Sequence, residues 1–138
     1  MVVGNNGTIL TSSDDATSWT SRTSGTTEHL YRVTFGDSTF VAVGNNGTIL
    51  SSSDGITWTS RTSGTSNILW AVKHVNKTFL TVGDNGTILT SSDNGTSWTS
   101  RTTGTTKDLW EVTYGNNNFC LLYTSDAADE GLGVDLGG

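Results

Sequence analysis

The sequence has no proline, one cysteine and few charged residues, and each scarcity narrows what the chain can be. Charged residues make up only 14% of it, which argues against a disordered polyelectrolyte. A single cysteine, Cys120, supports no disulfide argument. No apolar run approaches the length needed to cross a bilayer, so membrane insertion is not expected. The first residues, M-V-V-G-N-N, lack the pattern of a signal peptide.

Several functional signatures are also missing. The chain carries no phosphate-binding glycine loop, no zinc-ligand spacing and no basic surface with interleaved aromatics. No cofactor, metal or nucleic-acid partner is therefore predicted. No segment shows helical periodicity, whereas Thr, Ser, Asn and Gly alternate with short apolar runs, as in short strands joined by tight turns. The predicted fold class is all-β.

One stretch occurs three times, at a spacing of 39 or 40 residues, over 3–19, 43–58 and 82–98. A period near 40 residues made of strand-like runs is typical of a β-propeller, whose blades have about four strands. A two-layer sandwich is the main alternative, but near-identical units at a fixed period favour radial repetition. Within one period we predict four strands, over Leu30–Phe35, Thr39–Val43, Thr48–Ser52 and Thr57–Thr62.

Two local patterns make more specific predictions about these strands. Strict alternation along the first strand places side chains on two faces: Tyr31, Val33 and Phe35 on one, and Leu30, Arg32 and Thr34 on the other. The pair Asn46-Gly47 before the third strand predicts a tight hairpin, because both residues tolerate positive φ.

Counting units predicts an unclosed propeller fragment with two complete four-stranded blades, 30–68 and 69–108. A partial blade, 1–29, precedes them, and another begins at 109–119. Propellers usually close with ~4–8 blades. Met1 aligns with Val41 and Leu80, so we expect the chain to begin inside a blade. Exposed blade faces and edge strands predict that residues 1–119 alone self-associate.

The stretch 120–138 departs from the repeat and reads C-L-L-Y-T-S-D-A-A-D-E-G-L-G-V-D-L-G-G. It resembles the translation of a sequencing adapter, with fixed parts at Cys120–Glu130 and Val134–Gly138 and an index-sized gap between them. We therefore expect a non-native tail. Without it the formal net charge changes from −6 to −2, so most of the apparent acidity belongs to the tail.

Each copy of the repeat ends in a pattern close to S-x-D-x-G-x-[ST]-W. The third copy fits it fully, the first has Ala16 in place of Gly, and the second is one residue shorter. The pattern resembles the Asp-box, or bacterial neuraminidase repeat. The residues assigned to a structural Asp-box role are Ser12, Asp14, Trp19, Ser52, Asp54, Trp58, Ser91, Asp93, Gly95 and Trp98.

The chemistry of this pattern is local. The Asp can accept hydrogen bonds from backbone N–H groups of its turn, and the Gly permits a left-handed backbone. The Trp can bury a large apolar surface between adjoining sheets. Each copy supplies one carboxylate, whereas calcium takes 6–8 oxygen ligands, so no metal site is predicted.

Asp-box resemblance implies two classes of function. Sialidases and some glucan hydrolases carry Asp-boxes, but their chemistry needs clustered arginines and paired carboxylates. Here Arg22, Arg61 and Arg101 hold the same outer position in successive blades and are not expected to converge. Glu28 and Glu111 are the only glutamates before the tail. No catalytic residue is predicted for this chain, although an enzyme with catalytic residues in further blades stays an alternative.

The repeat more closely resembles propellers of the photosystem II stability and assembly factor-like family, which share V-G-x-x-G-x-I-L-x-[ST]-x-D-x-G-x-x-W. That resemblance implies a non-enzymatic scaffold that binds another protein and favours a location outside the cytoplasm. The same blades could instead bind a glycan or form a purely structural surface repeat.

Positions that differ among the three units are the candidates for binding. They fall in the crossover loop and along the first strand of each blade, where propellers commonly bind ligands. The candidate residues are Glu28, His29, Arg32, Asn67, His74, Lys107, Asp108 and Glu111. Ordinary drift at exposed loop positions would produce the same differences.

Overall fold

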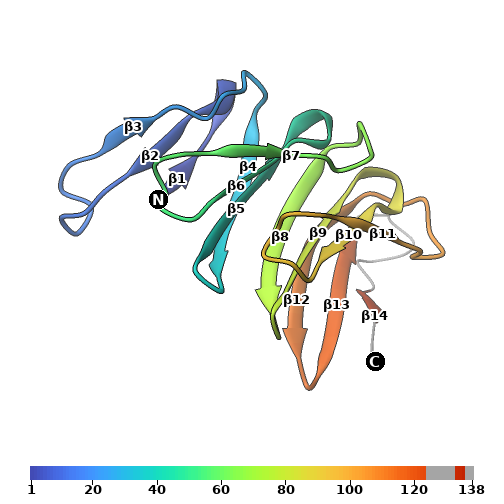
Figure 1. Cartoon of the computed structure of the whole chain (residues 1–138). Coiled ribbons are helices and arrows are strands. Elements are labelled where there is room, and N and C mark those ends of the chain that lie inside the picture. The colour runs from blue at the N-terminus through green and yellow to red at the C-terminus, as the bar shows by residue number, and fades with distance from the viewer. Residues whose placement is uncertain (124–132, 136–138) are drawn as a thin grey trace.

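The computed structural model describes residues 1–123 and 133–135, and they form four antiparallel sheets (Figure 1). The first sheet contains β1 (Val2–Val3), β2 (Ile9–Thr11) and β3 (Thr20–Arg22). The second contains β4 (Leu30–Gly36), β5 (Thr39–Gly44), β6 (Ile49–Ser52) and β7 (Thr59–Arg61). The third contains β8 (Leu69–Val75), β9 (Thr78–Gly83), β10 (Ile88–Ser91) and β11 (Thr99–Arg101). The fourth contains β12 (Leu109–Gly115), β13 (Asn118–Tyr123) and β14 (Gly133–Asp135).

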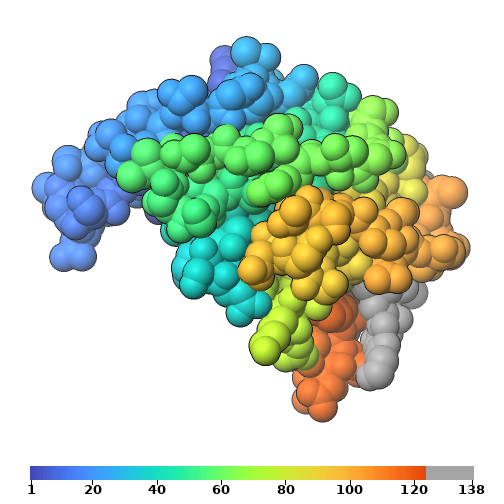
Figure 2. Space-filling view, viewed as in Figure 1, coloured from blue at the N-terminus to red at the C-terminus, as the bar shows by residue number. Residues whose placement is uncertain are grey.

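Strands that follow one another in the sequence are neighbours in each sheet, and the sheets follow one another as radial blades do. Figure 2 shows this succession from the blue N-terminal sheet to the orange fourth sheet. The described residues do not close a ring, so the predicted all-β, unclosed propeller is confirmed. No helix among them is long and apolar enough to cross a membrane. Of the predicted non-native tail, 124–132 and 136–138 lie outside the described residues.

The core consists of apolar clusters that join neighbouring sheets. The cluster between the second and third sheets is Val41, Val43, Ile49, Leu69, Val72, Phe79 and Leu89. The cluster between the third and fourth is Ala71, Leu80, Val82, Ile88, Leu109, Val112 and Leu121. Ile9 of the first sheet packs with Leu30, Ala42 and Leu50 of the second. Each sheet therefore depends on its neighbour to bury its apolar face.

The Asn-Gly pair forms the tight turn that its sequence predicts. In the turn η2 (Asn45–Gly47), Asn46 has φ 54° and Gly47 has φ 67°. A Cβ on Gly47 would lie 1.9 Å from the carbonyl oxygen of Thr65, so this position also needs the absence of a side chain. The turns η1 (Asn5–Gly7) and η3 (Asp84–Gly86) repeat the geometry in the first and third sheets.

The predicted faces of the first strand in the period are wrong at one point. Leu30 pairs with Gly44, but Arg32 pairs with the adjacent residue, Val43, so Tyr31 is extra and the strand contains a β-bulge. Because the bulge shifts the alternation, Leu30 lies on the same face as Val33, and Tyr31 lies with Arg32 on the other face. Leu30 and Val33 accordingly pack in the same cluster.

Candidate binding surface on the innermost strands

The strands β4, β8 and β12 are the innermost strands of successive sheets and lie side by side (Figure 1). Each contains a β-bulge at the same repeat position, and the extra residue is aromatic every time: Tyr31, Trp70 and Trp110. A bulge re-aims the side chains beside it. The three bulges thereby place one ring from each sheet on a common surface.

These rings form a continuous row across three sheets. The ring centroids of Tyr31 and Trp70 are 4.7 Å apart, and those of Trp70 and Trp110 are 4.6 Å apart. Their planes are tilted by 35° and 37°. The Nε1–H of Trp70 donates a 2.6 Å hydrogen bond to Oδ1 of Asp84, which fixes the central ring. The row is therefore an ordered apolar strip and not a set of independent side chains.

An ion pair flanks the aromatic row. Nη2 of Arg32 donates to Oε2 of Glu111 at 3.2 Å, and the two side chains are 56% and 36% exposed. The intervening sheet has Ala71 at this position, so the longer side chains meet across it. Oε1 of Glu111 also accepts a 3.0 Å hydrogen bond from the backbone N–H of Val112. The pair and the three rings line a hollow of about 480 Å³, here called the inner surface.

Two predicted binding residues of the crossover loops instead support the neighbouring turns. Nδ1 of His29 accepts a 3.0 Å hydrogen bond from the backbone N–H of Asn6. Oδ1 of Asp108 accepts an equivalent bond from Asn85 at 2.9 Å. Asn6 and Asn85 hold the same position in their copies of the repeat. These side chains thus tie the first and third crossover loops to the turn of the preceding sheet.

The other crossover residues lie in the same region. Oε2 of Glu28 accepts from Nδ2 of Asn45 at 2.9 Å, and Nδ2 of Asn67 donates to Oγ1 of Thr87 at 2.9 Å. Lys107 is half-buried in the third loop. The predicted candidates are therefore divided: Arg32 and Glu111 lie on the inner surface, and four of the loop residues bond to the turns.

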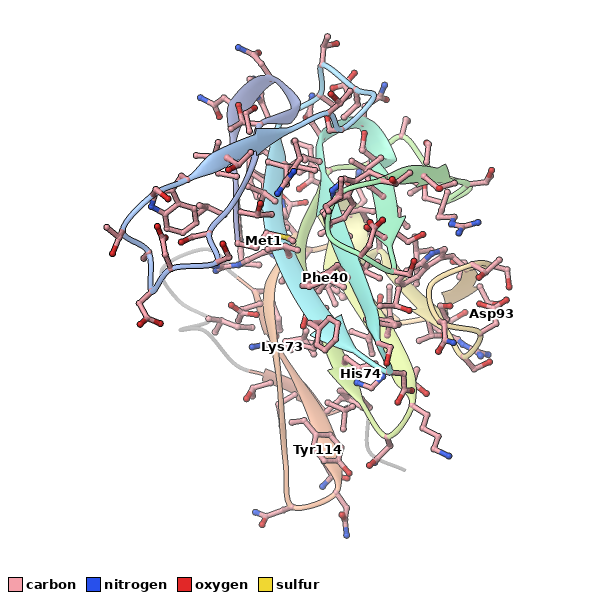
Figure 3. All side chains as sticks on the ribbon, turned by 60° about the vertical axis from the view of Figure 1, so that its left-hand side comes forward. Met1, Phe40, Lys73, His74, Asp93 and Tyr114 are labelled. Carbon is pink, nitrogen blue, oxygen red and sulfur yellow. The ribbon has the colours of Figure 1, made fainter. Side chains whose placement is uncertain are left out.

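His74 lies at the opposite end of its strand, beside a hairpin (Figure 3). Its Nε2 is 3.2 Å from Oδ2 of Asp37 in the preceding sheet, and its ring centroid is 4.6 Å from that of Phe79. In the next sheet, the hydroxyl of Tyr114 accepts a 3.0 Å hydrogen bond from Nδ2 of Asn76. The same position thus bridges neighbouring sheets in both places. His74 is not part of the inner surface.

The candidates chosen for their variation among the copies do not include the three aromatic residues, because this position stays aromatic in every copy although it changes from Tyr to Trp. Tyr31, Trp70 and Trp110 directly follow a leucine in all three units. A large half-buried ring repeated at one position is a signal that the sequence does contain. The position of these rings on the inner surface depends on the β-bulge, and no local sequence pattern indicates that bulge.

The Asp-box turns hold themselves together with short-range hydrogen bonds. In the third copy, Oδ1 of Asp93 accepts from the backbone N–H of Ser97 at 2.9 Å and from the hydroxyl of Ser91 at 2.7 Å. The hydroxyl of Ser97 donates to Oδ2 of the same carboxylate. Oγ of Ser91 accepts in turn from the backbone N–H of Gly95 at 3.0 Å. The first and second copies repeat this arrangement around Asp14 and Asp54.

These donors stabilise the ionised carboxylates. The hydroxyl and the backbone N–H of Ser18 are the main reasons why the pKa of Asp14 falls to about 2. The hydroxyl and N–H of Ser97 hold the pKa of Asp93 well below its usual range. Two backbone N–H groups of its turn lower the pKa of Asp54. All three carboxylates are committed to their own turns.

The tryptophans that follow these turns have unequal surroundings. Trp98 packs on the cluster between the second and third sheets, and its Nε1–H donates to the carbonyl of Gly95 at 3.0 Å. Trp58 packs on the cluster between the first and second sheets. Trp19 is 44% exposed. Each of the two packed tryptophans therefore lies against a cluster that joins its own sheet to the preceding one.

The described residues contain no group of three or more His, Cys, Asp or Glu side chains that could hold a metal ion. Their most distinctive surface chemistry is therefore the inner surface, which combines ordered rings with one cationic and one anionic side chain. Such a surface is suited to binding a partner through apolar and charged contacts.

Comparison with known proteins gives the family of the fold. The family model described as the DUF6242 β-propeller domain matches residues 1–126. No curated protein matches the chain. A solved structure described as "YCF48 bound to D1 peptide" superposes with a TM-score of 0.71 at 16% sequence identity. The match covers 99% of this chain and 48% of that one, so the chain spans about half the length of that protein.

Proposed function

The chain belongs to the DUF6242 β-propeller domain family, and we propose that it is a non-catalytic scaffold that binds a segment of another protein. The observation that carries this proposal is the inner surface, where three ordered rings and the Arg32–Glu111 pair come together from different sheets. A likeness to a propeller described with a bound peptide supports a peptide-like partner. An assembly role resembling that of photosystem II assembly factors is part of the same proposal.

The Asp-box assignment and the nature of the tail belong to this proposal as well. The hydrogen bonds around Asp14, Asp54 and Asp93 support a structural role for the three turns. We further propose that 120–138 derive from a sequencing adapter and that the protein acts outside the cytoplasm. Resequencing of the source DNA tests the first, and fractionation of the source cells tests the second.

A library of random 12-residue peptides displayed on phage, panned on the immobilised full chain, tests the binding function. We expect enriched peptides whose binding is lost in Trp70→Ala and Arg32→Glu. Trp19→Ala, which removes a half-exposed ring that does not line the inner surface, is the matched control and should bind normally. Enrichment of no peptide, or binding that ignores both inner-surface variants, contradicts the proposal. Binding to an array of neutral oligosaccharides instead would support a glycan partner.

A further inference from the structure

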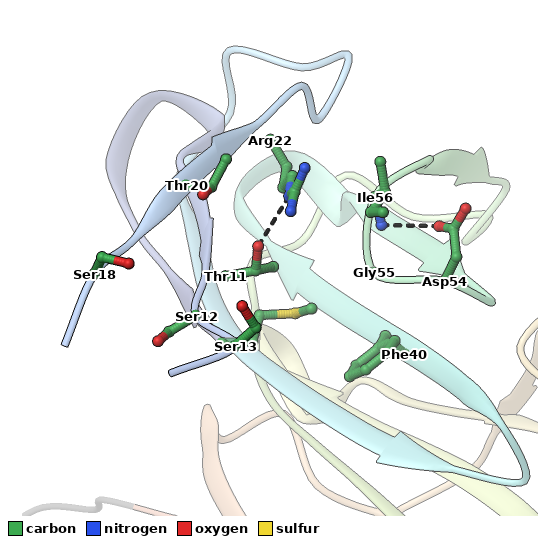
Figure 4. Close-up of a pocket in the computed structure, with 11 residues that line it drawn as sticks. Thr11, Ser12, Ser13, Ser18, Thr20, Arg22, Phe40, Asp54, Gly55 and Ile56 are labelled. Atoms are coloured by element: carbon green, nitrogen blue, oxygen red, sulfur yellow. Dashed lines mark hydrogen bonds between the residues drawn. The ribbon is translucent and has the colours of Figure 1, made fainter. Parts of the chain in front are cut away.

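Two polar clefts recur between neighbouring sheets, away from the inner surface. The first, drawn in Figure 4, has a volume of about 310 Å³ and lies between the outer strands of the first sheet and the turn that holds Asp54 and Ile56. The second has a volume of about 250 Å³ and lies between the outer strands of the second sheet and the turn that holds Asn94 and Thr96. Each cleft is lined by a row of serine and threonine hydroxyls and one arginine.

The arginine of each cleft is anchored by only part of its guanidinium. Nε of Arg22 donates to Oγ1 of Thr11 at 2.9 Å, and Nε of Arg61 donates to Oγ of Ser51 at 2.7 Å. A guanidinium has five N–H donors, so the Nη groups keep their donors for the cleft. Both arginines are half-buried, whereas Arg101, at the same repeat position, is exposed. As expected from the sequence, the three arginines bind to their own sheets and do not converge.

We infer that these clefts bind a tetrahedral oxyanion, either free or carried as a sulfate or phosphate ester on a carbohydrate. An oriented guanidinium with neighbouring hydroxyl donors matches the acceptor geometry of such a group. The positive charge of each cleft comes from its single arginine, whereas the chain as a whole has a formal net charge of −6. A second arginine cleft of the same design indicates that the arrangement belongs to the blade repeat.

The two clefts differ in the charge of one wall, and this difference predicts which cleft binds an anion more tightly. The first includes Asp54 in its lining, and a carboxylate there repels an anion. The second has Asn94 and Thr96 on the corresponding wall, and none of its described lining residues is acidic. The cleft of Arg61 is therefore the tighter site.

Equilibrium dialysis of the full chain against radiolabelled phosphate, at constant ionic strength set with chloride, tests this inference. We expect saturable binding that weakens about tenfold in Arg61→Gln, because a charge-assisted hydrogen-bond pair is lost. Arg101→Gln, which removes an exposed arginine from the same repeat position, should bind like the parent chain. Absence of saturation, or an equal loss in both variants, overturns the inference.

A second variant keeps the test decisive if Arg61→Gln does not fold. Asn94→Asp leaves Arg61 in place and adds a carboxylate to the second cleft, at a residue with φ 60° that Asp tolerates. It should weaken phosphate binding, and unchanged affinity overturns the inference. Competition then identifies the source of the anion. If a sulfated oligosaccharide displaces phosphate better than inorganic sulfate does, the anion is an ester on a glycan. Equal displacement by the two indicates a free anion. Displacement by neither contradicts the inference.

Discussion

The hydrogen bonds of an Asp-box turn join residues two to four positions apart, whereas the contacts of the inner surface join sheets that are distant in the sequence. Ser91 and Asp93 are separated by two positions. Arg32 and Glu111 are separated by 79, and the aromatic row crosses three sheets. The Ser–Asp hydrogen bond of the turn recurs in all three copies, but the ion pair exists because the copies differ.

The turns and the inner surface therefore have different roles within one repeat, stability for the turns and binding for the inner surface. The carboxylates of the outer turns accept hydrogen bonds from donors of the same turns, so the repetition of these bonds serves the stability of each blade. The inner surface is assembled from unlike residues of several blades, so only the assembled propeller presents it. We expect substitutions of the turn carboxylates and glycines to act on stability and substitutions on the inner surface to act on binding of a protein partner.

The largest loss of stability is expected for Gly95→Ala in the third Asp-box turn. Gly95 has φ 76°, and a Cβ there would lie 2.9 Å from Cγ2 of Val41, which is fully buried in the preceding sheet. The left-handed conformation costs roughly 1–2 kcal/mol for an L-residue, and overpacking adds about 1–3 kcal/mol. Urea denaturation should show a free energy of unfolding lower by about 3 kcal/mol. Val41→Ala in the same chain should recover part of that loss.

The reverse substitution in the first turn is the matched control. Ala16 already adopts φ 66°, so Ala16→Gly relieves backbone strain. We expect a small gain of about 0.5 kcal/mol, because the greater freedom of glycine in the unfolded chain offsets part of the relief. A loss of stability in Ala16→Gly would show that the first and third turns are not equivalent.

Local patterns in the sequence were sufficient for the second strand of the blade and the turn that follows it. The strand predicted over Thr39–Val43 is β5, Thr39–Gly44, and the Asn46-Gly47 pair adopts the positive φ angles that its residue types favour. These features depend on neighbours within a few residues. The period near 40 residues then sufficed to predict an unclosed propeller.

The inner surface could not be predicted in the same way. Alternation assigned Leu30 to the wrong face, because the bulge at Tyr31 depends on how β4 pairs with β5. Arg32 and Glu111 were both candidates, but their contact depends on the packing of three sheets and on the small side chain of Ala71 between them. The sequence shows which residues are present, but it does not show the strand register that brings them together.

Trp70→Phe tests how far the inner surface also carries stability. The substitution keeps a ring in the row but removes the 2.6 Å hydrogen bond to Asp84. We expect the free energy of unfolding to fall by about 1.5 kcal/mol, because a hydrogen bond to a charged group is lost. Asp84→Asn retains an acceptor, as the asparagines of the other copies do, and should cost less in the same denaturation experiment.

Acidification should act on the outer turns. The pKa of Asp14 is lowered from 3.8 to about 2, and those of Asp54 and Asp93 are lowered as well. Depressed pKa values stabilise the folded chain above the unfolded value of 3.8, and this contribution is lost as pH falls toward 2. The midpoint of thermal unfolding should decrease over that range. Asp93→Asn should make the decrease shallower, and an unchanged profile would contradict the role of this turn.

The smallest effect on stability is expected for Arg32→Ala, although this residue is central to the proposed binding. Its ion pair with Glu111 is exposed, and such pairs contribute about 0–1 kcal/mol. A double-mutant cycle with Glu111→Ala should give a coupling energy below about 0.5 kcal/mol that disappears at high salt. The same variant should lose binding to the peptides enriched on the parent chain. If Arg32→Ala instead destabilises the chain as much as Gly95→Ala, the pair serves the fold and the separation between outer and inner residues fails.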